Sequence, residues 1–206
     1  MICLAVLVGM QFLAVASAEI IVGVKQGDWI EYGITITGEV PEEHNVDWGK
    51  IEVIAVEGKK IDIKITSRYV DGREETLTAS LNLETGQIGD AFIIPANLGN
   101  GGTFREQHAG TMTISGVEER TYAGATRSVV YASTPITMFY WDQSTGVLVE
   151  ATSSYPDFTL TTKAEKTNMW QTQIFGLDPI VFIVLIVLLT AVLLALAIFL
   201  LRKMKK

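Results

Sequence analysis

The densest group of potential metal ligands in the sequence lies between residues 42 and 47. Glu42, Glu43 and Asp47 offer carboxylate oxygens, and His44 and Asn45 lie between them. Calcium takes about six to eight oxygen ligands, so an oxygen-rich loop of this kind can bind it. The spacing is not that of a regular calcium loop, and a solvated acidic loop is the simpler interpretation. We predict Glu42, Glu43 and Asp47 as a weak divalent-cation site only, and we expect no resident metal or cofactor.

Aromatic side chains supply a second candidate site. Phe139, Tyr140 and Trp141 are consecutive in the sequence. Such rings can line a groove for a lipid or a carbohydrate, although packing in the core and between strands is the commoner use. Because neighbours in a strand point to opposite faces, at least one of these rings must face outward or be covered by another element. We predict Phe139, Tyr140 and Trp141 as candidate ligand-binding residues.

Catalytic patterns are missing from the sequence. The two histidines, His44 and His108, lack the spacing of a zinc site or a protease, and no G-x-S-x-G elbow occurs. Neighbouring glutamates such as Glu74 and Glu75 lie in a strand-like segment, so their carboxylates would face opposite sides of a sheet. We predict no catalytic residues, and we predict that the protein is not an enzyme.

The segments that would position these groups have the pattern of strands. Apolar and polar side chains alternate over residues 61–66 and again over 77–83, which is typical of a strand with one solvated face. Glycine-containing turns follow at short intervals. We predict a mainly β domain, an antiparallel meander of about nine to eleven strands that forms a curved sheet, a half-barrel or a sandwich. Two longer loops, 41–47 and 95–110, interrupt the meander.

Apolar segments lie at both ends of the chain. Residues 1–18 end in Ala-Ser-Ala and predict a signal peptide, although no basic residue precedes the apolar run. Either the true start lies upstream, or this segment stays as a short anchor. Cys3, the only cysteine, lies here, so the rest of the chain has no thiol for a disulfide or a metal site. Residues 179–201 carry no charge and, at about 1.5 Å per residue, are long enough to cross a bilayer.

Charge predicts the orientation of the chain. Basic residues follow the C-terminal apolar segment directly, and the positive-inside rule places them in the cytoplasm. From residue 19 to residue 178, twelve basic and 23 acidic side chains leave a net charge of −11, which argues against nucleic acid as a partner. The predicted organisation is a signal peptide at 1–18, an extracytoplasmic β-domain at 19–170, a linker at 171–178, a transmembrane helix from Pro179 to Leu201, and a cytoplasmic tail at 202–206 that opens with Arg202 and Lys203.

Three segments resemble a family of archaeal cell-surface proteins. They are GDWIEYGITITG at 27–38, RTYAGATRSVVYAS at 120–133 and FYWDQSTGVLVEATSSYP at 139–156. The resemblance covers nearly the whole β-domain and the C-terminal anchor, and it implies location and architecture without an activity. The hairpin WDQSTGVL at 141–148 is also similar to one in bacterial periplasmic lipoprotein carriers, in which the concave face of a half-barrel holds acyl chains. Helices close the half-barrel of those carriers, whereas this domain has no comparable helical segment.

These features predict a membrane-anchored cell-surface protein whose domain binds or displays something beside the lipid bilayer. The expected partner is another envelope protein, or a lipid ligand held in the curved sheet. Two alternatives are an accessory subunit of a larger membrane complex and a domain that binds divalent cations weakly. An apolar cavity that opens outward would favour the lipid ligand, whereas an exposed apolar patch on a flat sheet would favour a protein partner.

Overall fold

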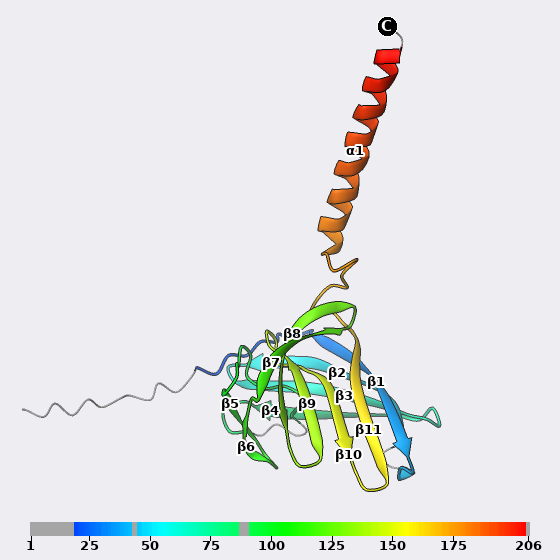
Figure 1. Cartoon of the computed structure of the whole chain (residues 1–206). Helices are drawn as coiled ribbons and strands as arrows, with labels where there is room; N and C mark the ends of the chain where they lie inside the picture. Colours follow the sequence, from blue (N-terminus) through cyan, green and yellow to red (C-terminus); the bar gives the residue numbers. More distant parts are fainter. Residues whose placement is uncertain (1–18, 43–44, 87–90, 205–206) are drawn as a thin grey trace, which may run out of the picture.

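The computed structural model describes residues 19–42, 45–86 and 91–204. The predicted signal peptide, Glu43 and His44 lie outside these residues. The described chain is mainly β, as predicted, with a single long helix that extends away from the strands (Figure 1). The elements are β1 (Trp29–Gly38), β2 (Val46–Glu57), β3 (Lys60–Tyr69), β4 (Glu74–Asn82), β5 (Thr103–Glu106), β6 (Gly110–Thr113), β7 (Gly116–Tyr122), β8 (Ala125–Ser133), β9 (Thr137–Asp142), β10 (Leu148–Ser154), β11 (Phe158–Thr167) and α1 (Pro179–Met204).

Nine of these strands form one antiparallel sheet in the order β4-β3-β2-β1-β11-β10-β9-β8-β7. Strands β1 to β4 and strands β7 to β11 each pair with the next strand in sequence, and β1 also pairs with β11, which brings the two ends of the domain together. The sheet stays open because β4 and β7 form its two edges. The predicted meander is confirmed, and it takes the form of a curved open sheet.

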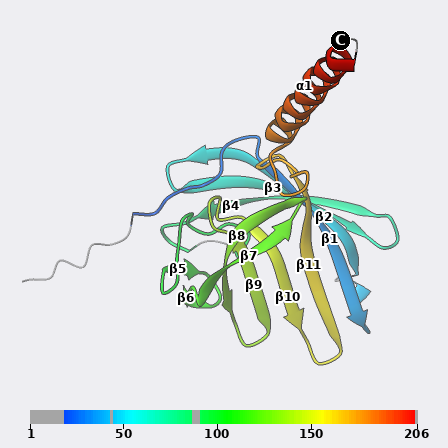
Figure 2. The same ribbon diagram turned by 45° about the horizontal axis from the view of Figure 1, so that its top comes forward.

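The β7–β8 hairpin gives this sheet its strongest curvature. Figure 2 shows the hairpin arching over toward the end of β11, and β7 contacts β11 although three strands separate them in the sheet. A strongly twisted and coiled sheet is the ordinary way to bring distant strands face to face. The concave face that results lies between β7 and β11.

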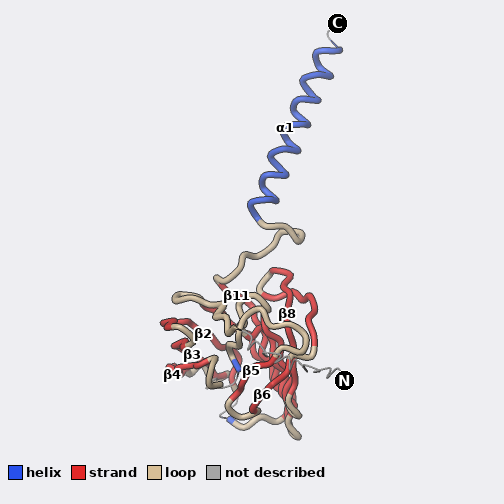
Figure 3. The backbone as a smooth tube through the Cα atoms, turned by 90° about the vertical axis from the view of Figure 1, so that its left-hand side faces the viewer, coloured by secondary structure: helices blue, strands red, loops and turns tan. Residues whose placement is uncertain are grey.

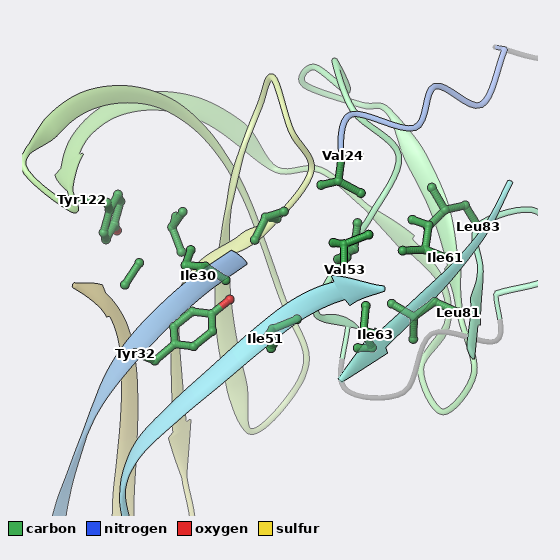
Figure 4. Close-up of a cluster of buried hydrophobic side chains, with 14 of the residues drawn as sticks. Val24, Ile30, Tyr32, Ile51, Val53, Ile61, Ile63, Leu81, Leu83 and Tyr122 are labelled. Carbon is green, nitrogen blue, oxygen red and sulfur yellow. The ribbon is translucent and has the colours of Figure 1, made fainter. Parts of the chain in front are cut away.

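The larger core cluster fills the space between strands β1–β4 and the β7–β8 hairpin, which we call the two arms of the sheet. In β3, Ile61 and Ile63 are fully buried, as their alternation predicts. Leu81 pairs with Ile61 and is buried too, but Leu77 is 56% exposed. The core ends before Leu77, because its partner Ile65 is itself only partly buried on the outermost pair of strands. Figure 4 shows side chains of this cluster, from Tyr122 at one end to Leu83 at the other.

A second core cluster lies under the short β5–β6 hairpin. Phe104 of β5 and Met112 of β6 pack there against residues of β8, β9 and β10. The predicted loop 95–110 is therefore wrong in part, because it contains β5 and the start of β6. Strands of four residues are too short to show an alternating pattern against their surroundings. The predicted loop 41–47 is also too long, since β2 begins at Val46 and includes Asp47.

The helix α1 begins at residues suited to a helix start. Asp178 accepts a hydrogen bond from the backbone N–H of Ile180 at 2.8 Å, and Pro179 occupies the first helical position, where its missing N–H costs nothing. The segment Pro179–Ile198 is long and apolar enough to cross a membrane, and none of it is buried against the domain. The helix continues past the predicted end at Leu201 to Met204, since Arg202 and Lys203 are good helix formers.

Gly146, in the turn between β9 and β10, lies where the backbone is too closely packed for a side chain. Its φ is +73°, and a Cβ there would collide with the carbonyl oxygen of Ile94. Gly146→Ala should therefore lower the free energy of unfolding by about 3 kcal/mol, measured by urea denaturation, because φ strain and a backbone clash combine. Gly58 has a φ of +60° with no atom within 4 Å of its Cβ position. Gly58→Ala should cost only about 1–2 kcal/mol, and equal losses at both sites would contradict the clash.

Candidate functional site

The three consecutive aromatic residues of β9 divide between the two faces of the sheet. Trp141 is fully buried, and its indole N–H donates to the carbonyl oxygen of Ala91 at 2.7 Å. Phe139 stacks on Trp141 with ring centroids 5.2 Å apart, and Phe104 of the β5–β6 hairpin meets Trp141 edge-on at 5.4 Å. The hairpin and the segment around Ala91 thus pack over Trp141, which has no exposed surface.

Tyr140 points to the opposite, concave face. The guanidinium of Arg120 lies 3.8 Å from the centre of the Tyr140 ring and donates a hydrogen bond of 2.9 Å to its hydroxyl. The ring of Tyr131 lies beside it, with centroids 5.8 Å apart. Of the three predicted aromatic residues, Tyr140 is therefore the one that shares a face with charged groups. Ligand binding by Phe139, Tyr140 or Trp141 remains a prediction.

Charged and aromatic side chains of four strands meet on this concave face. Arg120 of β7 forms an ion pair of 3.6 Å with Glu150 of β10, and the Tyr122 hydroxyl donates to the same carboxylate at 2.9 Å. Lys163 of β11 lies 3.9 Å from Glu150 and over the Tyr122 ring. Two strands separate β7 from β10 in the sheet, so only strong curvature allows these contacts. We call Arg120, Tyr122, Tyr140, Glu150 and Lys163 the concave cluster.

Together with the neighbouring Glu118, the concave cluster pairs two cations with two carboxylates. Burial alone would lower the pKa of Arg120, but hydrogen bonds with Tyr122 and Glu118 outweigh it and raise that pKa. Burial and the hydrogen bond to Glu150 raise the pKa of Tyr122, so its phenol stays protonated and donates. Among the described residues, no buried side-chain polar atom is left without a hydrogen bond. The cluster thus combines paired charges with two aromatic rings, of which Tyr140 is partly exposed and Tyr122 is buried.

Sequence reasoning missed most of the concave cluster. Glu118, Arg120 and Tyr122 occupy alternate positions of β7, so they form a polar and aromatic stripe along one face of the strand. This stripe is visible in the sequence, but the partners Glu150 and Lys163 are not, since the curvature of the sheet brings them near.

The buried carboxylate of Asp142 holds the turn between β9 and β10. It accepts from Arg127 Nε at 2.7 Å, from Ser144 Oγ at 2.7 Å, and from the backbone N–H of Thr145 at 2.9 Å. Burial alone would raise the pKa of Asp142, but these hydrogen bonds together hold the pKa below its ordinary value. The W-D-x-x-T-G pattern therefore describes a hydrogen-bonded turn.

The ionised form of Asp142 should make stability depend on pH. Its pKa is lower in the folded state, so its stabilisation is complete above the unfolded pKa of about 3.9 and is lost as pH falls through the folded value. Asp142→Asn should lower the free energy of unfolding by about 1–3 kcal/mol near neutral pH. In urea denaturation the difference from wild type should shrink below about pH 4. The exposed control Asp157→Asn should change little, and a pH-independent difference for Asp142→Asn would contradict the prediction.

The predicted cation site is only partly described. Asp47 pairs with Arg68 through Nε and Oδ1 at 2.9 Å. Glu42 lines a surface pocket of about 160 Å³ together with Tyr69 and Arg73, and Glu43 lies outside the described residues. Within the described ranges no three His, Cys, Asp or Glu side chains are grouped as metal ligands would be. Cation binding by Glu42, Glu43 and Asp47 remains a prediction.

The linker between the sheet and α1 is attached to the β7–β8 hairpin. The Trp170 indole N–H donates to the carbonyl oxygen of Tyr122 at 3.2 Å, and the Arg127 guanidinium lies over the Trp170 ring at 4.8 Å. Further along, Gln173 N–H donates to the carbonyl oxygen of Gly124 at 2.8 Å, and its side chain accepts from the N–H of Thr126. Figure 3 shows the linker running from the domain into α1. Through Gln173, then, the linker belongs structurally to the domain.

The pocket at the larger core cluster is too small for a lipid. It measures about 10 Å³ and is lined by Ile30, Ile51, Ile93 and other residues of the core. Such a volume holds at most one water molecule. The space between the arms of the sheet is filled by side chains at this point.

Comparisons with known proteins leave the family open. No protein-family model matches the chain, and no curated protein matches it. A solved structure of the siderocalin Ex-FABP, described as functioning through dual ligand specificities, is 8% identical and matches 71% of this chain and 76% of that one. The TM-score is 0.27, which is too low for the likeness to carry an argument about fold or function.

Proposed function

We propose that the protein is a membrane-anchored cell-surface protein whose non-enzymatic β-domain presents its concave face to another envelope protein. The observation that carries this proposal is the attachment of the linker to the β7–β8 hairpin immediately before α1. A domain that only needed a tether could have a free linker. Here the hydrogen bonds of Trp170 and Gln173 hold the linker on the hairpin until six residues before the helix begins.

Electrostatics supports the need for such an attachment. The net charge of −11 over residues 19–178 repels an anionic membrane surface, so charge alone would not hold the domain close to lipid. The basic residues at the C-terminal end of α1 favour a cytoplasmic position for that end. The resemblance to archaeal cell-surface proteins supports the same orientation.

A protein partner fits the concave face better than an enclosed lipid does. The core pocket of about 10 Å³ has no room for an acyl chain. The concave cluster carries aromatic rings and an arginine, which are residue types enriched at protein interfaces. Its charges are already paired, so a partner can cover them without leaving a buried charge alone.

The orientation is tested with two epitope tags in intact cells. One tag is inserted in the exposed turn at Asp71 and Gly72, and the other follows the C-terminal lysine. Protease added outside should remove the first tag and leave the second until the membrane is permeabilised. The opposite pattern would overturn the proposed location.

The partner is tested by crosslinking and native mass spectrometry. A photo-crosslinking residue at Tyr140 should yield one stoichiometric adduct, whereas the same residue at Asp157, in the exposed β10–β11 turn, should not. A co-purifying lipid without a protein adduct would overturn the choice of partner and favour the ligand hypothesis.

A further inference from the structure

An apolar turn lies between the attached linker and α1. The backbone of Ile174 and that of Leu177 exchange two hydrogen bonds, of 2.9 and 3.1 Å. The two residues between them, Phe175 and Gly176, have φ values of +51° and +76°. This is the geometry of a two-residue turn that strongly prefers Asn-Gly. A bulky aromatic residue in a left-handed conformation is unfavourable, so Phe175 occupies this position against its backbone preference.

The strained residue is also the most exposed aromatic side chain at this end of the domain. Phe175 is 90% exposed, and the flanking Ile174 and Leu177 are each 37% exposed. The Phe175 ring contacts Phe182 in the first turns of α1, with centroids 5.8 Å apart. The turn thus carries its apolar tip beside the start of the helix. In water, the exposed ring contributes no stabilisation that would offset the backbone strain.

We propose that the turn Ile174–Leu177 inserts into the interfacial layer of the bilayer that α1 crosses, with Phe175 as its tip. This inference rests on the proposed function, since it needs α1 to span lipid. The position supports it: Phe175 precedes the first residue of α1 by four positions, and apolar side chains such as phenylalanine bury at the boundary between headgroups and acyl chains. Trp170, an aromatic residue nine positions before α1, is engaged with Tyr122 and Arg127.

Insertion of the turn would set the tilt of the β-domain. Gln173 connects the turn to the β7–β8 hairpin through its bonds to Gly124 and Thr126, so the turn and the domain move together. A helix alone leaves the domain free to rotate about the point where the chain leaves the membrane. A second lipid contact beside the helix removes that freedom. It thereby fixes the orientation of the concave face relative to the membrane.

Depth-dependent fluorescence quenching tests the inference in the full-length protein. Single cysteines are introduced at Phe175, Leu189 or Asp157 in a Cys3→Ser background, labelled with an environment-sensitive fluorophore, and reconstituted in phosphatidylcholine vesicles. The vesicles carry a nitroxide either near the headgroup or near the end of the acyl chain. The label at 175 should lose fluorescence with the shallow quencher, the label at 189 with the deep quencher, and the label at 157 with neither.

The three positions separate failure of this inference from failure of the anchor. If the label at 175 behaves like that at 157 while the label at 189 is quenched by the deep nitroxide, the turn does not insert and the anchor stands. If the label at 189 is not quenched either, α1 does not span the bilayer, and the proposed function falls with the inference.

A variant pair shows whether the Phe175 ring causes insertion. The label is placed at Leu177 in both variants. Phe175→Asn keeps the turn, because asparagine accepts a left-handed conformation, but it removes the apolar tip. It should abolish shallow quenching at 177, whereas Phe175→Tyr should retain it. Equal quenching in the two variants would overturn the role of the ring.

Discussion

Ending the chain after Asp178 should release the protein from membranes into the soluble fraction. Leucine, isoleucine, phenylalanine and valine dominate the segment Pro179–Ile198, and each contributes about −0.3 to −0.6 kcal/mol to insertion near the centre of a bilayer. The sum of these contributions is the favourable free energy of membrane insertion that the truncated protein lacks. The measurement is fractionation of lysed cells by ultracentrifugation, followed by detection of the β-domain in pellet and supernatant.

Substitutions inside the helix separate loss of insertion from loss of the segment. Leu188→Arg with Leu189→Arg should raise the free energy of insertion by about 5–7 kcal/mol, because each central arginine costs about 2.5–3.5 kcal/mol. The matched pair Leu188→Ala with Leu189→Ala should stay in the membrane pellet. A truncated protein that remained with the membrane would contradict α1 as the anchor and implicate another part of the chain.

Replacement of Trp141 by alanine should lower the free energy of unfolding by about 3–5 kcal/mol, the range for truncating a fully buried aromatic residue. The ring fills the space between β9 and the β5–β6 hairpin, and its loss also leaves the Ala91 carbonyl without its indole donor. Urea denaturation of the detergent-solubilised protein, followed by circular dichroism, gives the measurement.

Two further variants on this strand calibrate the result. Trp141→Phe keeps much of the packing but removes the donor, and it should cost about 1–3 kcal/mol. Met138→Ala, at an exposed position of β9, should change stability by less than about 0.5 kcal/mol. A loss for Trp141→Ala as small as that for Met138→Ala would contradict the view that the hairpin is held through this ring.

The structure explains why a run of three aromatic residues occurs in one strand. Packing on a single core can use only alternate residues of a strand. Here Trp141 is covered on one face of β9 by the β5–β6 hairpin, and Tyr140 on the other face is partly covered by Arg120 of β7. The sequence predicted that at least one ring must face outward or be covered by another element, but it did not locate such an element in the segment 95–110.

The β class, the meander and the apolar C-terminal helix could all be predicted from the sequence. These features depend on local patterns: the alternation of residues 61–66, the glycine turns, and an uncharged run from Pro179. Local patterns survive in any arrangement of the strands, so they can be identified before the tertiary structure is known.

The folded chain was needed to show the open, curved form of the sheet, the ion pair of Arg120 with Glu150, and the attachment of the linker at Gln173. Each of these depends on curvature accumulated over several strands, which no single segment encodes. The conformation of the exposed Phe175 could not be predicted from the sequence either. Its residue type is visible in the sequence, but its left-handed backbone and its outward ring follow from the hydrogen bonds between Ile174 and Leu177 that close the turn around it.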